Sequence, residues 1–221
     1  MPRQDPSKEV PAPPTAPNRV TGSRDRLLER FNQAVRDPEE SGGLSTVARL
    51  LDLLAAGEPN PEGAVWLPDT NARLAASGIL RGAFPDADVP LIASQYGEDA
   101  HRRGWLRLDR TLTPAEHSAL VDTALTWSAV DRALPDVLAA FGPPSVTFGS
   151  PDPSLPKTLS YATADPEAPV VAFHLGTATP REPAPGAAGP TPANAVLLAV
   201  RIHDGFLDGC ELTPVGLERF H

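Results

Sequence analysis

Two histidines in the C-terminal half carry side chains that bind metal ions in many proteins. His174 and His203 each lie in an apolar segment that predicts a β-strand, so the two imidazoles can approach each other on one face of a sheet. Asp204 or Glu211 would supply a third ligand. The sequence has neither an H-E-x-x-H nor a C-x-x-C motif, and histidines on strands are more often structural. We favour the structural interpretation and keep a small metal-dependent hydrolase as an alternative.

Four arginines form the densest basic cluster of the chain. They are Arg102, Arg103, Arg107 and Arg110. Guanidinium groups bind phosphates and carboxylates through paired hydrogen bonds, so the cluster is a candidate anion-binding site. The acidic residues Glu98 and Asp99 lie immediately before it. We favour ion pairs with these acids over binding of a ligand.

The remaining motifs do not predict catalysis. The sequence has no G-x-S-x-G nucleophile motif and no glycine-rich motif of the G-x-x-x-x-G-K-[ST] or G-x-G-x-x-G type. Cys210 is the only cysteine, so it forms no disulfide within the chain. The neighbouring acids Asp208 and Glu211 raise the pKa of a thiol and oppose a reactive thiolate. We therefore expect no cofactor and favour a non-catalytic function.

The net charge of the chain limits the kinds of molecule that it is expected to bind. The formal net charge is −9, and residues 111–221 hold 12 acidic and 5 basic side chains. Binding to nucleic acid or to an anionic membrane requires clustered Lys and Arg, so this balance argues against both. It favours a basic protein partner. We expect that partner to bind at three acids of the last predicted strands, Asp204, Asp208 and Glu211.

The distribution of proline divides the chain. Of its 27 prolines, six lie in the first 17 residues and twelve in residues 143–192. Proline is poorly tolerated inside helices and central strands, so these two stretches are expected to be rich in loops. We predict a disordered Pro-rich leader over residues 1–22 and a mainly helical region with short strands over residues 23–142. An antiparallel β-rich region over residues 143–221 would form one domain with the helical region.

Apolar residues at helical spacing predict a helical hairpin in the N-terminal half. Its first helix begins at the N-cap Ser23 and ends at the Asp37-Pro38 pair, and its second covers residues 45–56 and ends at Gly57. Shorter elements follow along the chain. They are strands over residues 64–67, 89–93 and 105–109 and a helix over residues 69–76.

The strongest local signal is a capping box formed by Thr113, Pro114 and Glu116. It predicts the start of a helix that continues to about residue 127. Pro135 then either kinks this helix or opens a new one, which ends at Phe141 before Gly142.

Alternating and apolar segments predict four to five strands after residue 145. They cover residues 146–148, 158–163, 169–175, 195–203 and 206–212. Residues 176–194 form a mobile connection, Asp204-Gly205 is a hairpin turn, and Thr213-Pro214 begins a last short helix. The predicted fold class is α+β, with N-terminal helical segments packed on a C-terminal antiparallel β-meander.

The sequence also predicts the origin, the cellular compartment and the functional class of the protein. Only two of the 19 basic residues are lysines, which is typical of a high-GC bacterial genome. No secretory signal or membrane-spanning run is present, so we expect a cytoplasmic protein. Residues 141–145, 157–163 and 206–214 are similar to segments of small bacterial immunity proteins, over less than a third of the chain. We favour a regulatory or adaptor protein in differentiation or signalling, with an immunity-type inhibitor of a basic toxin as an alternative.

Overall fold

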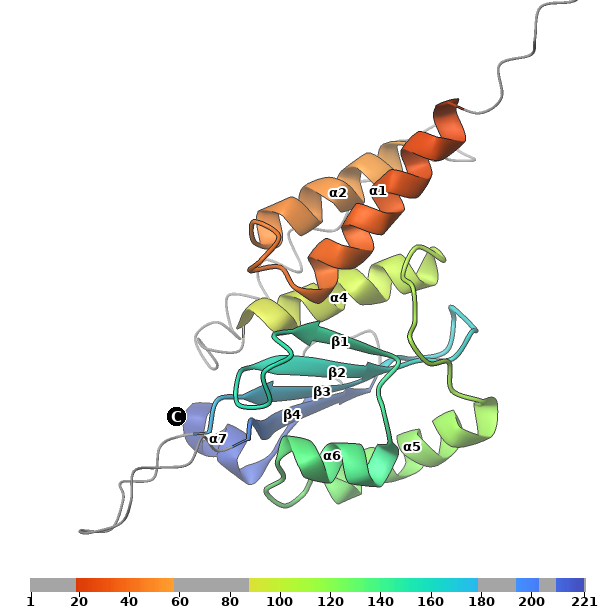
Figure 1. Cartoon of the computed structure of the whole chain (residues 1–221). Coiled ribbons are helices and arrows are strands. Elements are labelled where there is room, and N and C mark those ends of the chain that lie inside the picture. The colour runs from red at the N-terminus through yellow and green to blue at the C-terminus, as the bar shows by residue number, and fades with distance from the viewer. Residues whose placement is uncertain (1–18, 58–87, 179–193, 203–209, 221) are drawn as a thin grey trace, which may run out of the picture.

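A five-stranded antiparallel sheet forms the centre of the protein. The computed structural model describes residues 19–57, 88–178, 194–202 and 210–220. Within these residues the strands follow one another across the sheet in chain order, β1-β2-β3-β4-β5, and helices lie on both of its faces (Figure 1). The strands are β1 Val146–Gly149, β2 Lys157–Tyr161, β3 Val171–Gly176, β4 Val196–Ile202 and β5 Cys210–Leu212. The α+β class and the C-terminal β-meander are therefore confirmed.

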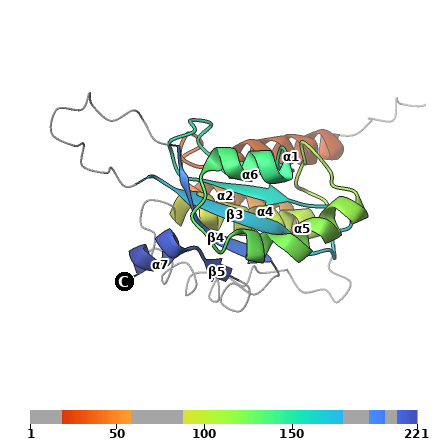
Figure 2. The same ribbon diagram turned by 90° about the horizontal axis from the view of Figure 1, so that it is seen from below.

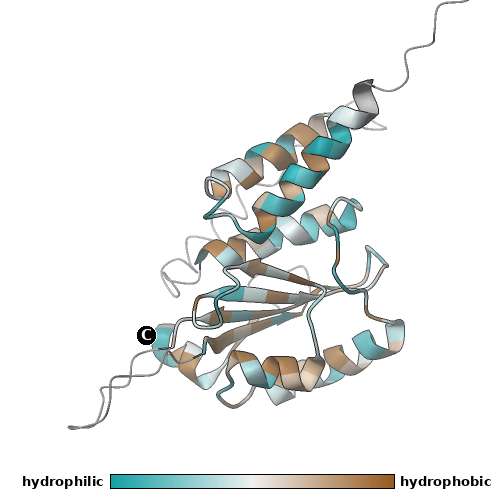
Figure 3. Ribbon diagram, in the orientation of Figure 1, coloured by the Kyte–Doolittle hydropathy of each residue, from teal (hydrophilic) through white to brown (hydrophobic). Residues whose placement is uncertain are grey.

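Three helices cover one face of the sheet. Helices α1 (Arg19–Arg36) and α2 (Leu44–Ala56) form the predicted hairpin, although α1 begins at Arg19 rather than at Ser23. Both helices are amphipathic, with hydrophilic residues on the outer side and hydrophobic residues between them (Figure 3). They pack on α4 (Asp88–Arg102), which lies directly on the strands. At Gly97 of this helix a Cβ atom would collide with the ring of Phe148 on β1, so glycine permits the close approach.

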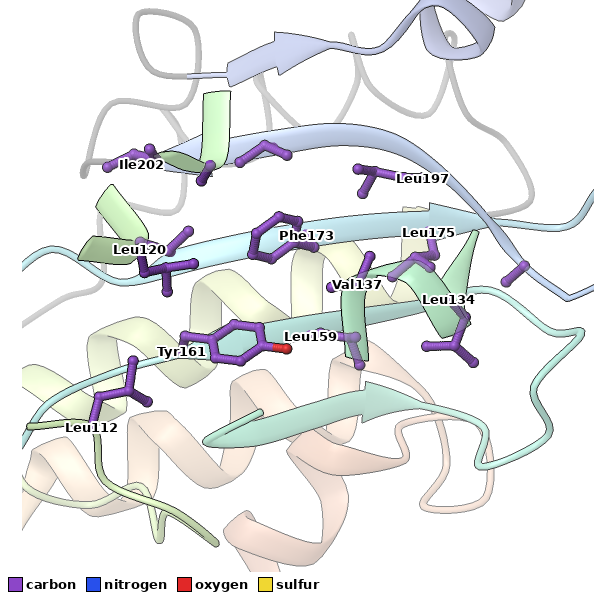
Figure 4. Packing of buried hydrophobic residues seen from close by; sticks show 14 residues of the cluster. Leu112, Leu120, Leu134, Val137, Leu159, Tyr161, Phe173, Leu175, Leu197 and Ile202 are labelled. Carbon is purple, nitrogen blue, oxygen red and sulfur yellow. The ribbon is translucent and has the colours of Figure 1, made fainter. Parts of the chain in front are cut away.

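Helices α5 (Pro114–Trp127) and α6 (Leu134–Phe141) cover the opposite face, as the second view shows (Figure 2). Apolar residues of both helices pack on the inward-facing residues of β2, β3 and β4, with Phe173 near the middle of the cluster (Figure 4). Trp127, Phe141 and Tyr161 surround Phe173 with ring centroids 5.1–6.2 Å from it. The short helix α7 (Pro214–Phe220) packs beside β4 and confirms the helix predicted after Thr213.

Local capping signals fix the ends of α5 and α6. The Thr113 hydroxyl accepts from the Glu116 amide at 3.2 Å, and the Glu116 carboxylate accepts from the Thr113 amide at 2.8 Å. The predicted capping box is therefore confirmed. Pro135 opens a separate helix rather than kinking α5, and α6 ends at Gly142, whose φ of 73° suits glycine.

Two of the predicted strands are wrong. Residues 89–93 belong to α4. The prediction failed because a short apolar run does not distinguish a buried strand from the first turns of a buried helix. Residues 105–109 pair with no strand among the described residues. The Asn32 side chain instead donates to the Trp105 carbonyl at 2.8 Å and accepts from the Arg107 amide at 2.6 Å, and so takes the place of a neighbouring strand.

Several predictions lie outside the described residues. They are most of the leader (residues 1–18), the strand at 64–67, the helix at 69–76, most of the connection at 176–194, and the Asp204-Gly205 turn with the start of the last strand.

Candidate functional site

The predicted metal site is described only in part. His174 lies on β3, whereas His203, Asp204 and Asp208 lie outside the described residues. Glu211 is exposed on β5. Within the part of the chain that the structure describes, no group of three His, Cys, Asp or Glu residues is arranged to hold a metal ion.

His174 is fully buried between the sheet and α4. Its Nδ1 lies 3.0 Å from the Thr158 hydroxyl, across the paired strands β2 and β3. Burial, with a further contribution from Arg201, lowers the pKa of the imidazole to about 3. The ring is therefore neutral at physiological pH, as a hydrogen-bonded structural histidine would be.

The four clustered arginines contact different parts of the molecule. Arg102 pairs with Glu98 at 3.3 Å and Asp99 at 3.7 Å, the acids we expected. Arg110 pairs with Glu116 at 2.7 Å and donates to two carbonyls at the C-terminal end of α6, those of Phe141 and Pro143. The guanidinium of Arg103 lies 5.3 Å from the ring centroid of Trp105, and the Arg107 carbonyl accepts from Arg36. The partners of these arginines thus lie in several parts of the molecule, and binding of an anion by the cluster stays a prediction.

A buried ion pair joins α4 to β4, and the sequence did not lead us to it. The Glu98 carboxylate lies 2.6 Å from the Arg201 guanidinium, with side chains 4% and 3% exposed. Glu98 also accepts from Arg102 at 3.3 Å. Arginine inside the otherwise apolar residues 195–202 was the available signal, because a buried charge requires a partner.

An open groove of about 420 Å³ lies beside β1, on the same side of the sheet as α6. We call it the β1 groove. Apolar side chains from α6, from the loop before β1 and from β2 form its walls: Leu134, Leu138, Pro144 and Leu159. Two of these wall residues, Leu134 and Leu159, appear in Figure 4. Leu138 is 39% exposed and so presents part of its side chain to solvent in the groove.

Three charged residues border the β1 groove, and each has a partner within the protein. Arg36 pairs with Asp109 at 2.6 Å, and the ammonium of the buried Lys157 donates to the carbonyls of Ser150 and Asp152. Burial lowers the pKa of Lys157, although the neighbouring Asp152 partly offsets this. Asp37, which follows α1, is the third, and its carboxylate accepts a hydrogen bond from the Glu40 amide at 3.3 Å.

A second hollow of about 250 Å³ adjoins the β1 groove and shares Asp37 and Gly149 with it. Leu155, from the loop between β1 and β2, lines this hollow and is 42% exposed. Exposed Glu39 also lies on its border. The end of β1 thus separates two adjoining hollows that combine apolar walls with acidic borders.

The thiol of Cys210 on β5 has a raised pKa, as predicted, but the main cause is burial rather than the neighbouring acids. Burial raises the pKa of its thiol to about 11; Glu211 adds to this effect and Arg201 opposes it. The thiol is therefore protonated at neutral pH and is a poor nucleophile.

Comparison with known proteins adds no family. No protein-family model, no curated protein and no solved structure matches the chain. Within the described residues, no helix has the length and apolarity required to cross a membrane.

Proposed function

We propose that this protein is a regulatory or adaptor protein that acts by binding another protein through the β1 groove. One observation carries the proposal: an apolar groove of about 420 Å³ contains a leucine, Leu138, that is 39% exposed. Partly exposed apolar side chains in a concave surface are typical of sites where a partner inserts its own apolar side chain.

The free energy gained by burying exposed leucines is large enough to support binding of a protein partner. Burying a leucine fully contributes about 1.5–3 kcal/mol, and a few such anchors carry most of the affinity of an interface. Leu138 in the β1 groove and Leu155 in the adjoining hollow are two candidate anchors on either side of Gly149. A partner segment that crosses the end of β1 would contact both leucines.

The charges of the border support a basic partner segment. Arg36 and Lys157 have partners within the protein, and the acids Asp37 and Glu39 border the adjoining hollow. A segment with an apolar side chain flanked by Lys or Arg complements this arrangement. The net charge of the whole chain is −9, which also favours a positively charged partner.

Of the three acids predicted from the sequence, only Glu211 lies within the described residues, and it lies on a different surface from the β1 groove. Glu211 lies on β5, at the opposite edge of the sheet from β1. Binding of a basic protein through Asp204, Asp208 and Glu211, including a toxin that the protein would inhibit, therefore remains a separate proposal that needs its own variant.

The test is an affinity purification with matched leucine variants. Leu138→Asp places a charge on the wall of the β1 groove, and Leu53→Asp places one on α2, where Leu53 is 48% exposed. The partner identified with the wild-type chain is then purified, and its dissociation constant for each variant is measured. We expect at least tenfold weaker binding for Leu138→Asp and unchanged binding for Leu53→Asp.

A third variant, Glu211→Lys, distinguishes binding at the β1 groove from binding at the edge formed by β5. If Leu138→Asp binds the partner as tightly as the wild type does, the β1 groove is not the binding site. Loss of binding in Glu211→Lys alone would then assign the contact to the β5 edge. A partner whose bound segment carries acidic side chains would contradict the inferred charge complementarity.

A further inference from the structure

A small cavity lies beneath α4, on the opposite face of the sheet from the β1 groove. Its volume is about 10 Å³, which is roughly the space that a single water molecule requires. Apolar residues form most of its wall, and they include side chains from β1 and from residues 105–109. Four polar residues also line it, and they are Ser94, Glu98 and His101 from α4 and Ser160 from β2.

Two polar atoms in this wall have no hydrogen-bond partner among the described residues. They are the Ser160 hydroxyl oxygen and the His101 Nε2, and both are fully shielded from solvent. An unsatisfied buried polar atom costs about 1–3 kcal/mol, so native proteins rarely leave two of them beside one cavity. The cavity and the two atoms are independent observations that indicate the same occupant.

We propose that this cavity binds one ordered water molecule that bridges α4 to β2. The water accepts a hydrogen bond from the Ser160 hydroxyl and donates one to His101 Nε2. Its second hydrogen is donated to Glu98, whose carboxylate has acceptor capacity beyond its contacts with Arg102 and Arg201. Three partners are typical of a buried water.

A neutral His101 imidazole is consistent with the hydrogen bonds proposed for the water. Burial lowers the pKa of the imidazole, although the nearby Glu98 carboxylate and a hydrogen bond to the Asp165 backbone oppose the lowering. A neutral imidazole with its proton on Nδ1 presents Nε2 as an acceptor. The bridge would hold Glu98 in the orientation in which it pairs with Arg201, so the water would support the ion pair between α4 and β4.

The first experiment uses the wild-type protein. A crystal structure at high resolution is expected to contain a density peak within hydrogen-bond distance of both Ser160 Oγ and His101 Nε2. In solution, nuclear Overhauser contacts between a long-lived water and the His101 ring are expected. A cavity without density and without such contacts, or one that contains a cation or another solute, overturns the proposal.

The second experiment uses variants and ¹⁵N resonances of the histidine rings. Ser160→Ala removes one partner of the water, so we expect the His101 Nε2 resonance to shift although no direct bond between these residues is present. Thr158→Val is the matched control on the same strand, because the Thr158 hydroxyl contacts His174. It is expected to shift the His174 resonance and to leave that of His101 unchanged. An unchanged His101 resonance in Ser160→Ala contradicts the bridge.

Discussion

At the scale of single residues, the interface between α4 and the sheet contains several buried polar groups. Glu98 and Arg201 pair at 2.6 Å, and Thr158 contacts His174 at 3.0 Å. Transfer of such groups from water is costly, so each is tolerated only while its partner remains in place. The arrangement thus makes the docking of α4 specific, because a shift of the helix would leave buried charges unpaired.

We predict that Glu98→Gln destabilises the protein by about 3 kcal/mol or more, because it leaves the buried Arg201 guanidinium without its charged partner. The measurement is the free energy of unfolding in urea at neutral pH. Glu211→Gln removes an exposed carboxylate and is the control, with an expected change below about 0.5 kcal/mol. Equal effects of the two substitutions would mean that the pair contributes nothing beyond a surface charge.

At the scale of the secondary-structure elements, α5 and α6 are delimited by short capping signals. The N-terminus of α5 has unsatisfied amides that the Thr113 and Glu116 side chains bind reciprocally. These hydrogen bonds, together with Arg110, lower the pKa of the Glu116 carboxyl. A lowered pKa in the folded state means that the carboxylate stabilises the protein above its ordinary pKa and that this stabilisation is lost as pH falls.

We predict that Thr113→Ala lowers the free energy of unfolding by about 1 kcal/mol, since it removes the acceptor for the Glu116 amide. Thr123→Ala is the matched control within α5. The Thr123 hydroxyl donates back to the Ala119 carbonyl at 2.7 Å, and alanine is the better helix former at an exposed interior position. We therefore expect the second substitution to leave stability unchanged or to raise it. Thermal unfolding followed by circular dichroism distinguishes the two, and a similar loss in both variants would contradict the capping role.

Elements were predictable from sequence where the signal was local. The capping box at Thr113 and the alternation within β2 depend on neighbours a few residues apart, so they were found. The strand predicted at 89–93 failed because five apolar residues do not fix a period, and only the tertiary contacts of α4 decide between helix and strand. The β1 groove combines Arg36 with Leu159, and no local pattern brings such distant residues together.

At the scale of the whole molecule, the two faces of one sheet have different chemistry. The face toward α5 and α6 is apolar and contains the aromatic cluster around Phe173. The face toward α4 carries Thr158, Ser160 and His174 on alternate positions of β2 and β3. The interface with α4 contains the buried imidazoles of His174 and His101, whose pKa values are lowered by burial, so this interface makes the fold sensitive to acid.

We predict that acid weakens the fold through His174. Burial lowers the pKa of this imidazole from 6.5 to about 3, so below pH 6.5 the unfolded chain binds a proton that the folded protein does not. The contribution of His174 to stability is therefore constant above about pH 7.5 and falls by about 1.4 kcal/mol per pH unit between roughly pH 6 and the folded pKa. The lowered pKa of His101 adds a loss of the same sign.

Urea unfolding of the wild type and of His174→Gln at pH 8, 7, 6 and 5 measures this contribution. Between pH 7 and pH 5, the free energy of unfolding is expected to fall less steeply in the variant than in the wild type. The difference in slope corresponds to close to one bound proton, whatever the stability of the variant at pH 8. Thr158→Val is the control, because it removes the hydroxyl that contacts His174 but no titrating group. It is expected to lower stability at every pH with the slope of the wild type. A His174→Gln slope equal to that of the wild type would show that His174 is protonated in the folded protein, and the neutral buried imidazole would be wrong.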